Sequence, residues 1–88
     1  MTEEELPKGT FSNLVLMLAT TGLMQLGEAP NPMTQELEPN LGLARHTIDS
    51  LAMLKEKTEG HLTREESGLL DGLLYELRMK YIEKTKGA

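Results

Sequence analysis

Residues 63–84 read TREESGLLDGLLYELRMKYIEK, and this stretch decides the fold of the chain. Leucines and one tyrosine recur in it at helical spacing and form one apolar stripe: Leu69, Leu70, Leu73, Leu74, Leu77 and Tyr81. At about 100° per residue a second stripe falls on roughly the opposite side, made of Gly68, Gly72, Tyr75, Met79 and Ile82. A helix that is apolar on two sides needs two neighbours. In a chain of 88 residues we expect one of them to be a second copy.

Local signals around this stretch predict a helical hairpin. Thr63, with Glu66 three residues later, is a capping box that begins the last helix. Upstream, Asn40 is a cap residue and Gly60 is a stop signal for a middle helix. The apolar residues of the middle helix share one half of its wheel: Leu41, Leu43, Ala44, Ile48, Leu51, Ala52 and Leu54. Because only a short turn joins the two helices, they should pack antiparallel.

The segment from Gly9 to Gly27 contains no charged residue. Ser12 can cap a helix here, with Phe11 just outside it as half of a hydrophobic staple, and Gly27 can end it. The helix is apolar almost all round, which is typical of a buried helix, and Met17 and Met24 should fill the core. Its dense apolar run is shorter than the about 20 residues that a membrane span needs. We therefore expect a buried helix and no membrane span. Because two amphipathic helices cannot cover this helix alone, we expect a second copy to complete its burial.

Three prolines, at positions 30, 32 and 39, separate the first two helices, and no helix continues through such a density of proline. We expect the connection to pack over the bundle as a strap. The predicted organisation is a flexible acidic leader at 1–10, a single helical domain at 11–86, helices at about 13–26, 41–58 and 64–84, and a proline-rich linker at 27–39.

Composition limits the classes of partner. The net charge is −5, which disfavours nucleic-acid binding and attraction to anionic membranes, since both need clustered Lys and Arg. There is no cysteine, so thiolate chemistry and thiolate metal sites are excluded. The first residues, MTEEEL, are acidic where a secretory signal is basic, and we expect a cytoplasmic protein.

No pattern predicts catalysis or metal binding. His46 and Asp49 lie on one helix face and His61 lies in a turn, but a zinc site needs three or four protein ligands. Arg45 and Asp49 are better explained as an exposed ion pair at i,i+4 spacing. The serines have no neighbouring base, and the glutamates occupy a loop or a first helical turn. We expect no enzyme activity, no metal and no cofactor.

The second stripe of the last helix is the candidate interface: Gly68, Gly72, Tyr75, Met79 and Ile82. A glycine inside a helix costs about 1 kcal/mol relative to alanine. Two of them one turn apart suggest that another backbone comes close there. Drift on a tolerant surface would explain them equally well, and both interpretations stay open.

Several segments resemble a bacterial family classified only as a domain of unknown function, DUF1844. They comprise residues 43–49 (LARHTID), 53–60 (MLKEKTEG), 62–66 (LTREE) and 73–81 (LLYELRMKY), with Phe11-Ser12 and the Leu26-Gly27-Glu28 turn before the linker. The resemblance covers nearly all of the chain after the leader and implies a small helical bacterial protein, with no activity or site residues. Gly68 and Gly72 depart from the family pattern, which more often has charged residues there.

The sequence therefore predicts an all-α chain of three helices, whose bundle is completed by homo-oligomerisation to a dimer or larger assembly. The function expected is that of a non-enzymatic interaction or structural module whose partner is a second copy, and a further, unidentified protein partner is left open. A small-ligand or metal-binding protein with an intersubunit pocket is one alternative. A membrane-associated accessory protein that uses the first helix is another.

Overall fold

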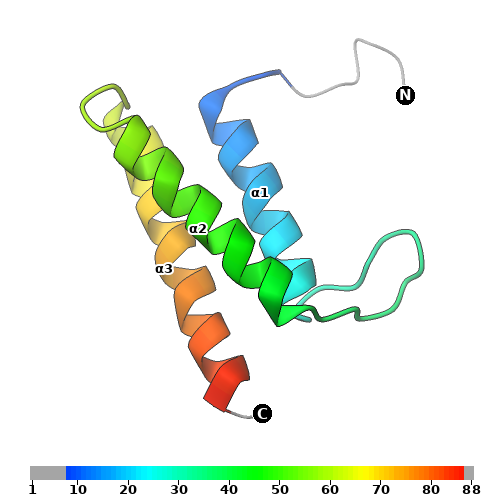
Figure 1. Ribbon diagram of the computed structural model, residues 1–88. Helices are drawn as coiled ribbons and strands as arrows, with labels where there is room; N and C mark the ends of the chain where they lie inside the picture. The colour runs from blue at the N-terminus through cyan, green and yellow to red at the C-terminus, as the bar shows by residue number, and fades with distance from the viewer. Residues whose placement is uncertain (1–7, 87–88) are drawn as a thin grey trace.

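The computed structural model describes residues 8–86, which form three helices and no strand: α1 (Phe11–Gln25), α2 (Leu41–Lys57) and α3 (Arg64–Lys86) (Figure 1). The predicted all-α class is confirmed. Most of the predicted leader, residues 1–7, lies outside the described residues, as do residues 87–88.

The hairpin of α2 and α3 is antiparallel, as predicted, and α1 runs in the same direction as α3 (Figure 1). Each helix contacts the other two. α1 lies closest to α2 where α1 ends and α2 begins, and the two helices diverge toward the start of α1 (Figure 1). The buried core draws on all three helices: Val15, Ala19, Leu26, Ala44, Ile48, Leu51, Leu70, Leu74 and Leu77.

Two of the three predicted caps are confirmed. Asn40 Oδ1 accepts a hydrogen bond from the Leu43 N–H at 3.1 Å. The capping box is reciprocal, since the Thr63 N–H donates to Glu66 Oε1 at 2.8 Å and the Glu66 N–H donates to Thr63 Oγ1 at 3.1 Å.

The predicted cap of the first helix is wrong by two residues. Thr10, not Ser12, caps α1, and its Oγ1 accepts from the Asn13 N–H at 3.1 Å. The Asn13 side-chain amide also donates to the Lys8 carbonyl at 2.8 Å, which fixes the chain before Thr10. Phe11 is consequently the first helical residue and packs against the core instead of standing outside the helix.

Glycines end the first two helices as predicted. Gly27 and Gly60 have φ of 79° and 82°, a left-handed conformation that a side chain disfavours. After α1 the Gly27 N–H donates to the Met24 carbonyl and the Glu28 N–H donates to the Leu23 carbonyl, which is a Schellman motif. The helices end at Gln25 and Lys57, one residue before the predicted limits, and α3 continues two residues beyond its predicted end.

The leucine stripe of α3 faces the core as predicted, with Leu70, Leu74 and Leu77 buried. In α2 the predicted apolar half is correct except at its edge. Leu43 is 49% exposed, because it lies at the margin of the buried face and α1 does not cover it.

α1 approaches both other helices at Gly22, which is buried. A Cβ placed on Gly22 would lie 3.3 Å from Leu77 Cδ2 and 3.3 Å from Thr47 Cγ2, so this glycine lets α1 approach both other helices. Beside it, the buried hydroxyl of Thr47 donates to Gln25 Oε1 at 2.5 Å. This bond satisfies the one buried polar side chain of the described core.

The proline-rich connection is not the strap that the sequence predicted. It projects away from the helices as a protruding loop (Figure 1). Its two large apolar side chains, Met33 and Leu37, are 89% and 60% exposed. The strap prediction was wrong because the Schellman turn and the next cap hold both ends of the loop at one corner of the bundle.

Candidate interaction surfaces

α1 is not fully buried within one chain. Val15, Ala19 and Gly22 face the core, but on the opposite side Leu14 and Met17 are exposed and Thr21 and Met24 are half-buried. We call this side the outer face of α1. It is defined by Leu14, Met17, Thr21 and Met24, which recur at helical spacing, with the exposed Thr20 beside them. Met17, predicted to fill the core, is 59% exposed, because neither α2 nor α3 covers this side of α1.

This face offers few polar groups to water. The Thr20 and Thr21 hydroxyls donate back to the Leu16 and Met17 carbonyls, at 2.9 and 3.1 Å, so their donors are used inside the helix. No residue from position 9 to position 27 carries a charge. The outer face of α1 is therefore an uncharged and largely apolar surface.

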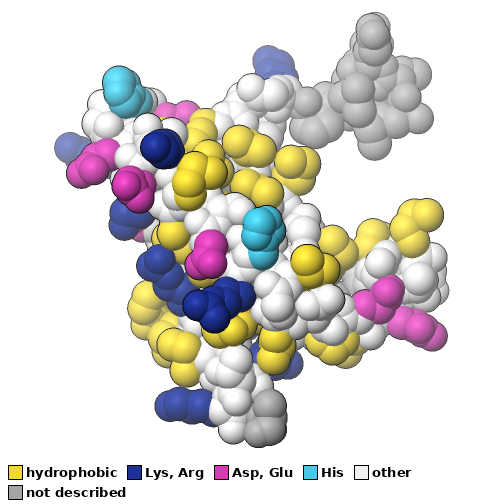
Figure 2. Space-filling model, in the orientation of Figure 1, with side chains coloured by type: hydrophobic (Ala, Val, Ile, Leu, Met, Phe, Trp, Pro, Cys, Tyr) yellow, Lys and Arg dark blue, Asp and Glu magenta, His cyan; other side chains and the backbone are white. Residues whose placement is uncertain are grey.

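Two hollows border this face. The first lies beside the opening turn of α1 and is lined by Lys8, Gly9, Thr10, Phe11, Asn13, Leu14 and Met17. The second, of about 240 Å³, lies at the other end between α1 and the loop, lined by Thr21, Met24, Gln25, Asn31 and Glu38. Figure 2 shows hydrophobic side chains gathered over the first half of α1 and again on the protruding loop.

The loop is ordered by its own hydrogen bonds. The Asn31 N–H donates to the Glu36 carbonyl at 2.9 Å, and the Gln35 N–H donates back to the Asn31 carbonyl at 2.7 Å. Asn31 Oδ1 also accepts from the Met33 N–H, and the Thr34 hydroxyl donates to the Glu38 carboxylate at 2.6 Å. Met33 and Leu37 are thus presented on a closed turn and not on a slack connection.

The predicted α3 interface residues lie together on the surface opposite the core. Tyr75, Met79 and Ile82 are exposed. A Cβ added at Gly68 or Gly72 would meet no atom within 4 Å, so no backbone of the same chain approaches these glycines. The interface role of this stripe stays a prediction.

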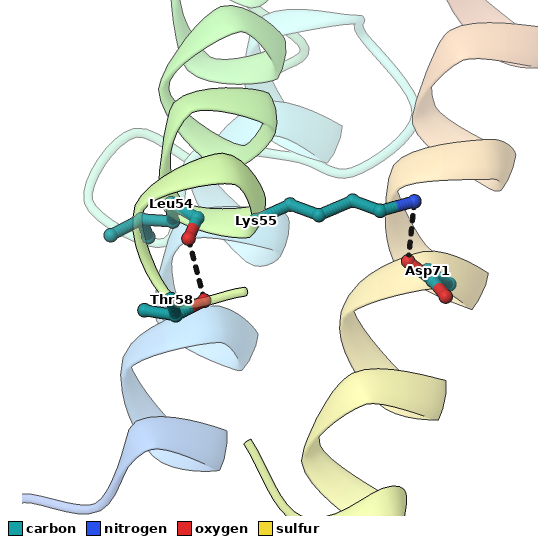
Figure 3. A network of polar contacts seen from close by, with 4 residues as sticks. All are labelled: Leu54, Lys55, Thr58 and Asp71. Carbon is teal, nitrogen blue, oxygen red and sulfur yellow. Dashed lines mark hydrogen bonds and ion pairs between the residues drawn. The ribbon is translucent and has the colours of Figure 1, made fainter. Parts of the chain in front are cut away.

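A groove of about 470 Å³ runs between α2 and α3 near their connecting turn. Its floor includes the buried Leu70 and Leu74, and its rim carries charges of both signs. Lys55 reaches across from α2 to Asp71 of α3, with 2.9 Å between Nζ and Oδ1, while the Thr58 hydroxyl donates to the Leu54 carbonyl (Figure 3). The ion pair is half exposed, and such pairs contribute about 0–1 kcal/mol.

The polar face of α2 is exposed as expected, including Arg45, Asp49, Glu56 and Lys57. The ion pair expected between Arg45 and Asp49 is not formed. Ion pairs in the described part of the chain instead join different segments, from Lys55 to Asp71 and from Glu28 to Lys80 and Lys84.

His46 and His61 are exposed and lie on different segments. Within residues 8–86, no three His, Asp or Glu side chains come together in a way that would hold a metal ion. None of the described helices has the length and apolar content to cross a membrane.

A scan against family models matches residues 8–83 to DUF1844, a domain of unknown function. This chain belongs to the DUF1844 family. The match begins just before the cap of α1 and ends in the last turn of α3, so the DUF1844 domain contains all three helices and the loop. Searches of curated proteins and of solved structures gave no match.

The sequence of this DUF1844 domain pointed to this surface in part. With no charge from position 9 to position 27, the first helix is apolar on most sides, and two amphipathic helices cannot cover it alone. The sequence did not show which residues would stay uncovered, and Met17, expected in the core, is one of them.

Proposed function

We propose that this protein is a non-enzymatic interaction module that works as a homo-oligomer. The observation that carries the proposal is the outer face of α1, which is uncharged, largely apolar and exposed at Leu14 and Met17. Isolated exposed apolar residues are ordinary, but a contiguous patch rimmed by polar groups marks an interaction site. Leu16, 44% exposed, adds apolar surface on the flank of the same helix.

A second copy is the partner that this surface favours. In a two-fold dimer the same patch meets itself, so charges within it would be repeated opposite one another. The outer face of α1 carries none, and self-association costs no charge repulsion. The α3 stripe is a second surface of the same kind, although its two glycines provide little apolar area.

Light scattering coupled to gel filtration at micromolar concentration tests the proposal. We expect a mass at least twice 9.8 kDa. Met17→Asp should dissociate the assembly, because it places a charge on the outer face of α1. Met53→Asp is the matched control, since Met53 is 47% exposed on the polar face of α2, and it should leave the mass unchanged. A monomer of the parent chain under these conditions would overturn the proposal.

A further inference from the structure

We infer that two copies pack their α1 helices antiparallel, and that the protruding loop of each copy covers the first turns of α1 in the other. The inference rests on the proposed self-association and adds which surfaces meet. The molecule that covers α1 is a second copy of this chain, which contacts it through Met33 and Leu37 of its loop.

α1 alone offers too little area for a stable interface. A helix of 15 residues is about 22 Å long and about 10 Å wide, so its face alone provides well under the roughly 800 Å² per partner of a standard interface. Further surface must therefore come from beside α1. The loop supplies it, since Met33 and Leu37 are the neighbouring large apolar side chains with the greatest exposure.

The loop and the open half of the outer face lie at opposite ends of α1. The loop follows the C-terminal end of α1 and already forms one wall of the hollow at Thr21 and Met24. The other half of the outer face, at Leu14 and Met17, has no such wall. A two-fold axis across the middle of the outer face places the C-terminal end of each α1 beside the opening turn of the other. Each loop then lies on the half that is open in its partner.

The loop and the opening turn of α1 differ in charge. The loop carries Glu36 and Glu38, and positions 28–40 contain no Lys or Arg. The hollow at the opening turn contains Lys8 and the N-terminal end of α1, whose helix dipole favours negative charge, and positions 8–27 contain no acidic residue. Among the described residues, the acidic loop thus meets a lysine and a helix N-terminus in the antiparallel arrangement, whereas a parallel arrangement would place loop against loop.

The loop holds its conformation without a partner. Its internal hydrogen bonds at Asn31 and Thr34 hold the turn, so little further ordering is needed when Met33 and Leu37 become buried. Two large apolar side chains on an exposed turn contribute nothing to a simple connection between two helices.

Cross-linking tests the arrangement directly, because the native chain has no cysteine. A tagged Leu14→Cys chain and an untagged Met33→Cys chain are refolded together and treated with a short bismaleimide. Each chain has one thiol, so a product of mixed mass can only join two copies. We expect the mixed product in high yield. A tagged Gly72→Cys chain, mixed with the same Met33→Cys chain, is the control and should give little.

The outcomes separate this inference from the proposed function. A dimer by light scattering with the mixed Leu14–Met33 product supports both. A dimer that cross-links through Gly72→Cys pairs and not through the mixed pair overturns the antiparallel arrangement and leaves self-association intact. A chain that remains a monomer removes the proposed function, and this inference with it.

A loop variant provides a second test that does not depend on thiol geometry. Met33→Ser with Leu37→Ser should weaken dimerisation at least about tenfold, because each apolar tip is buried twice in a two-fold interface. Both residues are exposed in the protomer, so circular dichroism should show an unchanged fold. Met53→Ser is the matched control. An unchanged dissociation constant in the loop variant would overturn the inference.

Discussion

Gly22 of α1 and Gly72 of α3 both lie inside helices, but their surroundings differ. A side chain at Gly22 would press on Leu77 and Thr47, whereas one at Gly72 would meet no atom within 4 Å. Glycine costs about 1 kcal/mol in either helix relative to alanine. At Gly22 the close approach of three helices offsets that cost. At Gly72 nothing within the chain does, and any compensation must come from another molecule.

The largest effect is expected from a bulky residue at the crossing. Gly22→Leu should lower the free energy of unfolding by at least about 1–3 kcal/mol, because overpacking forces the helices apart. Urea denaturation followed by circular dichroism measures the change. Gly72→Leu is the matched control. If both variants lose the same stability, the contrast between the two glycines is mistaken.

The hydrogen bond beside the crossing should contribute less to stability than the packing at Gly22. Thr47→Val keeps the shape but removes the hydroxyl that donates to Gln25, and it should cost about 1 kcal/mol. Denaturant unfolding again gives the value. Thr20→Val makes the same exchange at an exposed site with a bond to its own helix, and it should change stability by a few tenths of a kcal/mol. Equal losses in the two variants would show that the Thr47–Gln25 bond does not matter.

At Gly72 an added side chain should raise the free energy of unfolding instead of lowering it. Gly72→Ala should raise stability by up to about 1 kcal/mol through helix propensity, visible as a higher melting temperature. The double variant Gly68→Leu, Gly72→Leu examines the α3 stripe as an interface. If another backbone lies close to these glycines, the double variant loses its oligomeric state. A variant that keeps its oligomer and melts higher than the parent excludes the glycine stripe as an interface.

The smallest effect is expected on the polar face of α2, which belongs to neither region. Arg45→Ala should change stability by about 0.5 kcal/mol or less, because Arg45 is exposed and forms no ion pair with Asp49. This variant sets the baseline against which the two glycines are compared. A loss of several kcal/mol would reveal an unrecognised network on that face.

Sequence reasoning succeeded where structure is decided over a few residues. The reciprocal bonds of Thr63 and Glu66 follow from their spacing, and the left-handed conformations of Gly27 and Gly60 follow from the absence of a side chain. The leucine stripe of α3 was predictable for the same reason, since periodicity alone tells which side of a helix is apolar.

Prediction from the sequence failed where the structure depends on which helices meet. The neighbours of Gly22 are Thr47 and Leu77, far away in sequence, so no local pattern marks it as the crossing point. The same limit applies to Met17, because composition shows that α1 is apolar on most sides but not which of those sides α2 and α3 cover. The predicted cap of α1 was wrong by only two residues, because the hydroxyl of either Thr10 or Ser12 can cap a helix.

The two ends of the proline-rich loop lie side by side. The Asn40 N–H donates to the Gln25 carbonyl at 2.7 Å, and Pro39 packs against Gly27, where an added Cβ would lie 3.1 Å from the proline Cβ. With its two ends fastened together, the segment between them touches the helices at few points: Glu28 pairs with Lys80 and Lys84 of α3, and Asn31 and Glu38 border the hollow beside α1. Doubling the length of such a closed loop costs only about 0.6 kcal/mol. Loops of other lengths and compositions can therefore be grafted between Glu28 and Pro39 while the three helices keep their packing.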